Sequence, residues 1–259
     1  MTLVAVIATL ALMGCDPAEP VAGGEPAPPA AHLAFADEFN GSALDAGAWT
    51  TCYPWQPPVD CTNAGTGEEE WYTPAQVTVG SGAAHLTATR ADTAGRTRDW
   101  SPKVYPYASG MITTGGHFSF TYGYVEIRAK VPRGGALWTT LWLLPADFSW
   151  PPEVDILEAK GREPDRALTT YHPPGGGEPA TWTDVANSGD WHTYAVDWRP
   201  GSLTWIIDGH QVFHQDQSPS VPMYVLANLA VGGSFGGAIG SDTPSTASLD
   251  LDYVRVQTY

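Results

Sequence analysis

The chain has 259 residues, with 28 Asp and Glu against 12 Lys and Arg, and a formal charge of −16. Hydrophobic residues make up 43% and charged residues 15%, a balance that allows a sizeable core and excludes bulk disorder. The acidic surface would repel nucleic acid and anionic lipid. The 11 Trp residues instead suit a neutral partner with apolar faces, such as a sugar polymer.

Residues 1–15 have the pattern of an export signal. An apolar run at 1–12 has the length of a secretory signal and is too short to span a bilayer. A small residue precedes Cys15, as lipoprotein processing requires, so we expect a lipid anchor on Cys15, and an ordinary signal peptide with an incidental cysteine is the alternative. The Pro/Ala/Gly-rich residues 16–32 predict a tether. We therefore expect an exported protein, anchored at the cell surface or periplasmic side, or else secreted, with the lipid as its only membrane contact.

Cys52 and Cys61 enclose a Pro-rich loop. An exported chain meets oxidising conditions, so a disulfide between them is favoured. A metal-binding pair is the weaker alternative, because no second Cys/His pair with zinc spacing accompanies them.

The remaining chain, residues 33–259, is a series of short β-like runs separated by Gly, Pro and Asp, without an evident amphipathic helix of ten or more residues. Apolar and polar side chains alternate along several runs, and Asp208-Gly209 between two of them predicts a tight hairpin. The runs are 122–131, 192–198, 203–207, 211–213, 225–231 and 249–256. Strands this short and frequent predict one all-β sandwich domain.

Three acids lie within six residues in Glu153-Val-Asp155-Ile-Leu-Glu158. In a regular strand Glu153 and Asp155 share a face and Glu158 faces the other way. One extra residue near 156–157, a β-bulge, would return Glu158 to the face of the other two. Three neighbouring carboxyls cannot all ionise freely, and separated pKa values are what glycoside hydrolysis uses. A calcium site and a solvated acidic edge are the alternatives.

This motif, EVDILE, resembles the bulged E-[ILV]-D-x-x-E signature of laminarinase-like β-1,3-glucanases in glycoside hydrolase family 16. Other segments resemble the same family in the same order: FADEFNG, the stretch 118–145 with LWTTLW, WHTYAVDW, TWIIDG, VLANLAVGGSF and LDYVRV. The resemblance implies a concanavalin A-like β-jelly-roll sandwich whose concave sheet forms an open substrate cleft.

The resemblance also implies double displacement with retained anomeric configuration and no catalytic cofactor. Glu153 would then be the nucleophile, and Glu158 the general acid and later the general base. Asp155 would hold Glu153 and tune the proton balance between the two.

For substrate binding, the resemblance implies contacts from Trp138 and Trp142, which alternation places on one strand face. Packing in the core is the alternative role for both. Trp71, Asn228 and His172 match further substrate-side positions of the family. The first His of the family's H-G-T-x-H segment is replaced here by Leu168, and a structural role is the alternative for His172.

Many relatives bind a structural calcium ion away from the chemistry. The matching ligand positions in this chain are Glu38, Gly82 and Asp252, and oxygen ligands suit this cation.

The sequence therefore predicts an endo-acting, monomeric hydrolase of β-1,3-glucan or mixed β-1,3/1,4-glucan. A hydrolase of galactan or agar, or a transglycosylase on the same fold, is the enzyme alternative. A non-catalytic glucan-binding protein is a further alternative, although such relatives typically lose the acids that this chain keeps.

Overall fold

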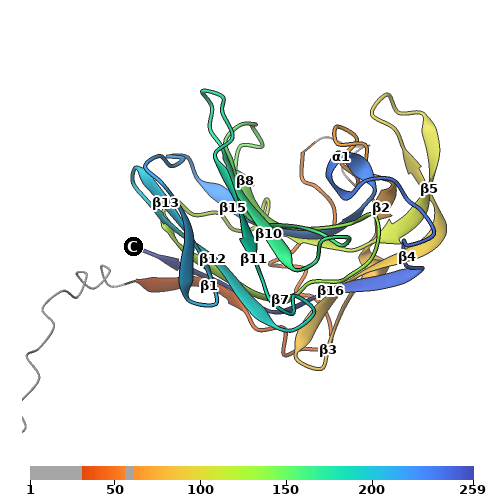
Figure 1. The fold of residues 1–259 in the computed structure, drawn as a ribbon, viewed down its shortest axis with the longest axis horizontal. Coiled ribbons are helices and arrows are strands. Elements are labelled where there is room, and N and C mark those ends of the chain that lie inside the picture. Colours follow the sequence, from red (N-terminus) through yellow and green to blue (C-terminus); the bar gives the residue numbers. More distant parts are fainter. Residues whose placement is uncertain (1–30, 56–60) are drawn as a thin grey trace, which may run out of the picture. The chain divides into compact units, whose positions relative to one another are not determined.

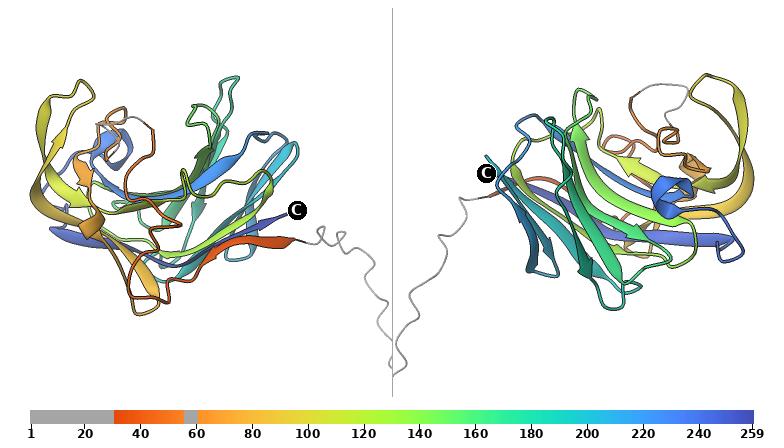
Figure 2. Two further views of the ribbon diagram at one scale, coloured as in Figure 1. Left: turned by 180° about the vertical axis from the view of Figure 1, so that it is seen from behind. Right: turned by 45° about the horizontal axis from the view of Figure 1, so that its top comes forward.

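The computed structural model describes residues 31–55 and 61–259. The predicted export signal, Cys15 and nearly all of the tether lie outside the described residues. The described part is an all-β sandwich of two sheets that lie face to face as curved layers (Figures 1 and 2). None of its helices is long and apolar enough to cross a membrane.

The larger sheet has ten strands, eight of them in one continuous path. Along that path the order is β14 (His210–Gln215), β13 (Ser202–Ile207), β12 (His192–Arg199), β7 (Gly123–Lys130), β16 (Thr246–Thr258), β4 (Ala83–Arg96), β5 (Pro102–Ser109) and β2 (Glu70–Tyr72). Two more strands pair off the path: β1 (His32–Asp37) with β16, and β3 (Val77–Gly80) with β4.

The smaller sheet has six strands. Their order is β11 (Ala180–Asp184), β10 (Arg166–His172), β9 (Glu153–Lys160), β8 (Leu137–Pro145), β15 (Met223–Val231) and β6 (Met111–Thr113). The helices of the described part are a 3₁₀ turn, η1 (Pro74–Gln76), and the one-turn α1 (Gly233–Gly236).

The alternation read from the sequence is confirmed where it was clearest. In β7 every second side chain is fully buried, including Val125 and Ile127. β13 and β14 form the predicted hairpin, with Asp208 and Gly209 at positive φ in its turn. A main apolar core fills the space between the two sheets.

A second apolar cluster lies on the other side of the six-stranded sheet, which we call its outer face. Its buried members are Tyr53, Tyr72, Met111, Trp142, Leu144, Tyr224 and Leu226. The disulfide Cys52–Cys61 lies beside it, and Cys61 packs against it. At the far end of the larger sheet, the β4–β5 hairpin curls upward beside α1 (Figure 1). The cluster covers part of the outer face and leaves β9 and β10 to form the site.

Candidate active site

Strand β9 carries the three predicted acids and contains the predicted β-bulge. Trp142 of β8 lies opposite Asp155, and the preceding Leu141 lies opposite Leu157. One step along β8 therefore corresponds to two steps along β9, and Ile156 is the extra residue.

Because of this bulge, all three acids lie on the outer face. Asp155 is opposite Trp142, Glu158 is opposite Thr140, and residues two apart on β8 share a face. Glu153 precedes Asp155 by two residues and shares that face as well. The remaining central side chains of the strand, Val154, Ile156 and Leu157, are buried in the main core. The apolar residues between the acids are what anchor the carboxyl row to the sheet.

The acids are held by three polar contacts. His172 of β10 lies opposite Glu153, and its Nε2 is 2.9 Å from Oδ2 of Asp155. The indole N–H of Trp150 donates to Oε2 of Glu153. From the opposite sheet, the indole N–H of Trp205 reaches through the core and donates to the backbone carbonyl of Asp155 at 2.8 Å. Both the side chain and the backbone of the central acid are therefore fixed.

Burial and mutual repulsion raise the pKa of all three acids. Burial and the charge of Asp155 raise the pKa of Glu153 to about 8. Burial and the charge of Glu153 raise the pKa of Glu158 to about 7. Burial and the charge of Glu158 raise the pKa of Asp155 well above its ordinary value. At neutral pH the row thus holds protons that can be moved or donated.

Of the predicted substrate-side tryptophans, Trp138 is half-buried and Trp142 is only 6% exposed. The indole N–H of Trp142 donates to Oδ1 of Asn228 at 2.8 Å, and the amide of Asn228 donates to the hydroxyl of Tyr72 at 3.1 Å. Both tryptophans lie on the face of the acids, since they are cross-strand partners of Lys160 and Asp155. Trp142 is accordingly part of the floor beside the acids and is packed in the outer cluster.

The structure does not bring Trp71 to this floor. Its neighbours in β2, Glu70 and Tyr72, are buried, and strand alternation turns Trp71 the other way. Its ring packs against Tyr105 at 5.4 Å between centroids and fills the space above Gly95. Trp71 therefore holds the β4–β5 hairpin.

The sequence interpretation missed Trp150, whose side chain is 64% exposed although it bonds to Glu153. Trp150 lies three residues before Glu153 in the sequence, and this proximity to the predicted nucleophile could have identified it as a residue of the site.

It also missed Trp182 and Phe235, which continue the aromatic surface beyond Trp138. The rings of Trp138 and Phe235 are 5.2 Å apart, and those of Phe235 and Trp182 are stacked at 6.0 Å. Nζ of Lys160 lies 4.5 Å from the centre of the Phe235 ring. These contacts depend on the pairing of β10 with β11 and on the α1 loop, which a linear pattern does not reveal.

The predicted calcium positions do not fit a calcium site. Both oxygens of Glu38 are bonded to the guanidinium of Arg255, at 2.7 and 2.8 Å, and this contact lowers the pKa of Glu38. Asp252 is bonded to Arg128 at 2.6 Å. Gly82 lies at positive φ in the β3–β4 turn. Two guanidinium groups thus neutralise the carboxylates that a cation would need.

Among the residues described, one group has the composition of a metal site: ligand atoms of Glu153, Asp155 and His172 lie within 4.8 Å of one another. Nε2 of His172 is engaged by Asp155, and Glu153 is bonded by Trp150. In the structure, His172 and two of the carboxyls are thus engaged in hydrogen bonds.

Carboxyls with raised pKa values, set in a row beside aromatic rings on one face of a β-sandwich, are the arrangement typical of glycoside hydrolases. Comparison with known proteins gives the particular family. Residues 68–254 match the family described as Glycosyl hydrolases family 16, and the chain belongs to this family.

The chain is 34% identical over 241 residues to the endo-1,3-1,4-beta-glycanase ExsH of Rhizobium meliloti (strain 1021), covering 85% of this chain and 50% of that protein. It is 30% identical over 286 residues to the beta-glucanase of Rhodothermus marinus, covering 95% and 91%. The laminarinase catalytic domain from Thermotoga maritima MSB8 superposes with a TM-score of 0.78 at 26% identity, covering 88% and 98%. The chain spans about half the length of the first of these relatives.

Proposed function

We propose that the chain is an endo-acting glycoside hydrolase that cleaves β-1,3-glucan or mixed β-1,3/1,4-glucan with retention of configuration. The observation that carries this proposal is the bulged β9 strand, which places Glu153, Asp155 and Glu158 in one row on the outer face. The family match supports β-glucan as the substrate class. So do two of the relatives, which are named as an endo-1,3-1,4-beta-glycanase and a beta-glucanase.

In the first step, a carboxylate oxygen of Glu153 attacks the anomeric carbon while Glu158 donates its proton to the leaving glycosidic oxygen. The pKa of Glu158, raised to about 7, keeps a donatable proton at neutral pH. In the second step, Glu158 takes a proton from water, the water oxygen bonds to the anomeric carbon, and Glu153 is released. The cycle uses no cofactor.

Asp155 allows Glu153 to act as a nucleophile even though the pKa of Glu153 is raised. A pKa of about 8 would keep Glu153 protonated in the free site, where it could not attack. Asp155 adjoins Glu153, and its own pKa is also raised, so one proton is shared by the pair. When the proton lies on Asp155, Glu153 is an anion stabilised by the Trp150 N–H, and His172 keeps Asp155 in place.

The aromatic surface supports a glucan chain extending beyond the acids. Trp138, Phe235 and Trp182 form a continuous series of rings, and Trp150 is an exposed ring on the Glu153 side. Apolar sugar faces stack well on such rings. A surface with rings on both sides of the acids favours cleavage within a chain.

The test is hydrolysis of laminarin, lichenan, agarose and galactan by the wild type, Glu153→Gln, Glu158→Gln and the exposed control Asp216→Asn. We expect cleavage of laminarin or lichenan, unchanged in the control and lost by several orders of magnitude in the two active-site variants. Cleavage only of agarose or galactan would reassign the substrate. Glucan binding without release of reducing ends would favour a non-catalytic binding protein, and longer products would favour transglycosylation.

We further propose an exported, monomeric protein with residues 1–15 as the signal, 16–32 as a tether and a lipid on Cys15. Radiolabelled palmitate on the full-length chain, absent from Cys15→Ala, is the expected result. No label on the wild type would contradict the anchor.

A further inference from the structure

Two acids outside the catalytic row, Glu68 and Glu70, are 3% and 0% exposed. Their side chains are in hydrogen-bonding contact. Within the described residues, no Lys, Arg or His forms an ion pair with either. Two bare negative charges in such a place would repel each other strongly, so the pair must keep a proton.

The surrounding donors indicate which acid carries that proton. Glu68 accepts from the hydroxyl of Thr66 at 2.8 Å, from the backbone N–H of Asn63 at 3.3 Å and from the hydroxyl of Tyr72 at 3.4 Å. Glu70 accepts at Oε2 from the N–H of Val231 at 2.7 Å.

The other oxygen of Glu70, Oε1, is buried and has no donor. A proton on Oε1 turns this unpartnered acceptor into a donor to Glu68. Glu70 is then the neutral acid, and Glu68 is the carboxylate.

This proton sets the direction of a chain of hydrogen bonds that ends beside the catalytic row. With its hydroxyl proton directed to Glu68, the oxygen of Tyr72 accepts from the amide of Asn228 at 3.1 Å. The amide oxygen of Asn228 is thereby turned to the indole N–H of Trp142, at 2.8 Å. Trp142 is the cross-strand neighbour of Asp155.

We propose that Glu70 is a positioning residue, whose proton, shared with Glu68, orients Tyr72, Asn228 and Trp142 and so fixes the floor on which the glucan chain lies. The inference rests on the proposed function for its effect on substrate. Its structural part, the direction of the hydrogen bonds, stands independently of activity.

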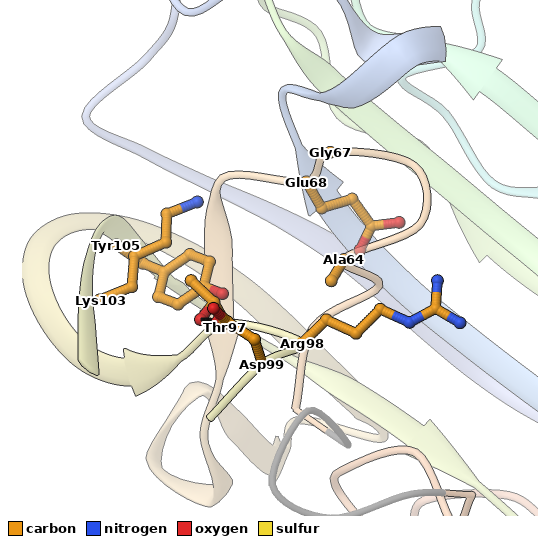
Figure 3. Close-up of a pocket in the computed structure, with 8 residues that line it drawn as sticks. All are labelled: Ala64, Gly67, Glu68, Thr97, Arg98, Asp99, Lys103 and Tyr105. Atoms are coloured by element: carbon orange, nitrogen blue, oxygen red, sulfur yellow. Dashed lines mark hydrogen bonds between the residues drawn. The ribbon is translucent and has the colours of Figure 1, made fainter. Parts of the chain in front are cut away.

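The charged groups around the pair agree with this assignment. Glu68 lines a cavity of about 310 Å³ between the β4–β5 hairpin and the loop before β2, and Glu70 does not (Figure 3). Two cations, Lys103 and Arg98, and one acid, Asp99, line the same cavity. Glu69 faces away and pairs with Lys103 at 3.4 Å.

The tyrosines packed around the pair, Tyr53, Tyr72 and Tyr105, are neutral, because burial and the acids raise the pKa of each. Burial and the charge of Glu68 raise the pKa of Glu70 well above its ordinary value, and burial raises that of Glu68. Because the pKa of Glu70 is higher in the folded protein than in the unfolded chain, the protonated side chain contributes stability at low pH. This stability is lost as the pH rises through the pKa of Glu70 in the folded protein.

The decisive variant is Glu70→Gln, because a glutamine amide can donate to Glu68 as the acid does but does not titrate. Glu69→Gln is the matched control, the same change on the neighbouring side chain. We expect the melting temperature of the wild type and of Glu69→Gln to fall relative to that of Glu70→Gln as the pH rises from 6 to 10. The catalytic acids titrate equally in all three proteins, so their effect cancels in the comparison.

The indole N–H signal of Trp142, identified by its absence in Trp142→Phe, should shift further over the same pH range in the wild type than in Glu70→Gln, where only the catalytic acids beside it titrate. Over this pH range the KM for a laminari-oligosaccharide should rise about fivefold in the wild type and not in Glu70→Gln. A fivefold change corresponds to about 1 kcal/mol of lost hydrogen bonding. The pH profile of kcat should be the same in both proteins. Parallel melting curves and an equally shifting indole signal would overturn the inference. Absence of glucan cleavage with the expected indole behaviour would overturn only the proposed function.

Discussion

Raising the pH from 6 to 8 should remove the proton that Glu158 donates. With a pKa of about 7, the protonated fraction of Glu158 is about 90% at pH 6 and about 10% at pH 8. If protonation by Glu158 is needed for bond cleavage, kcat/KM should therefore fall about tenfold over this interval. The active form also keeps one proton on the Glu153–Asp155 pair, and with a pKa of about 8 for Glu153 this proton is half lost at pH 8, which adds about a further twofold to the fall.

The assay is kcat/KM on a laminari-oligosaccharide at closely spaced pH values, with circular dichroism at each pH to confirm that the protein stays folded. The control Asp216→Asn changes an acid whose side chain is 98% exposed and should give the wild-type profile. A flat profile between pH 6 and 9 in folded protein would refute the assignment of Glu158 as the acid.

Three further outcomes are expected. Trp142→Phe leaves Oδ1 of Asn228 buried without its donor, so the free energy of unfolding in urea should fall by about 1–3 kcal/mol, and an unchanged value would show that the bond is unimportant. EDTA should leave the melting temperature unchanged because arginines neutralise Glu38 and Asp252, whereas a drop of several degrees, reversed by calcium, would contradict this reading. Reducing the disulfide, whose cysteines are nine residues apart, should destabilise the fold by about 3 kcal/mol on the chain-entropy estimate, and a melting curve indifferent to reductant would count against that estimate.

Much of the site was readable from the sequence because its geometry is local. The faces of Glu153, Asp155 and Glu158 follow from strand alternation and one inserted residue, and both can be counted along the chain. The apolar residues between the acids had to face a core, so the sequence allowed only one orientation of the two faces of the strand.

Features that depend on distant pairing were not readable in this way. Arg255 bonds to Glu38 across 217 residues, whereas the sequence comparison with the family predicted Glu38 as a calcium ligand. Trp205 bonds to the Asp155 backbone from the opposite sheet. The burial of Glu68 and Glu70 is likewise not evident from the sequence, where the two acids stand in a run of three glutamates.

The most direct test of the central claim is the configuration of the first product. Proton NMR during the first minutes of hydrolysis of a laminari-oligosaccharide should show the β-anomer of the new reducing end, before it equilibrates in water. Initial appearance of the α-anomer would exclude double displacement and with it the roles proposed for Glu153 and Glu158.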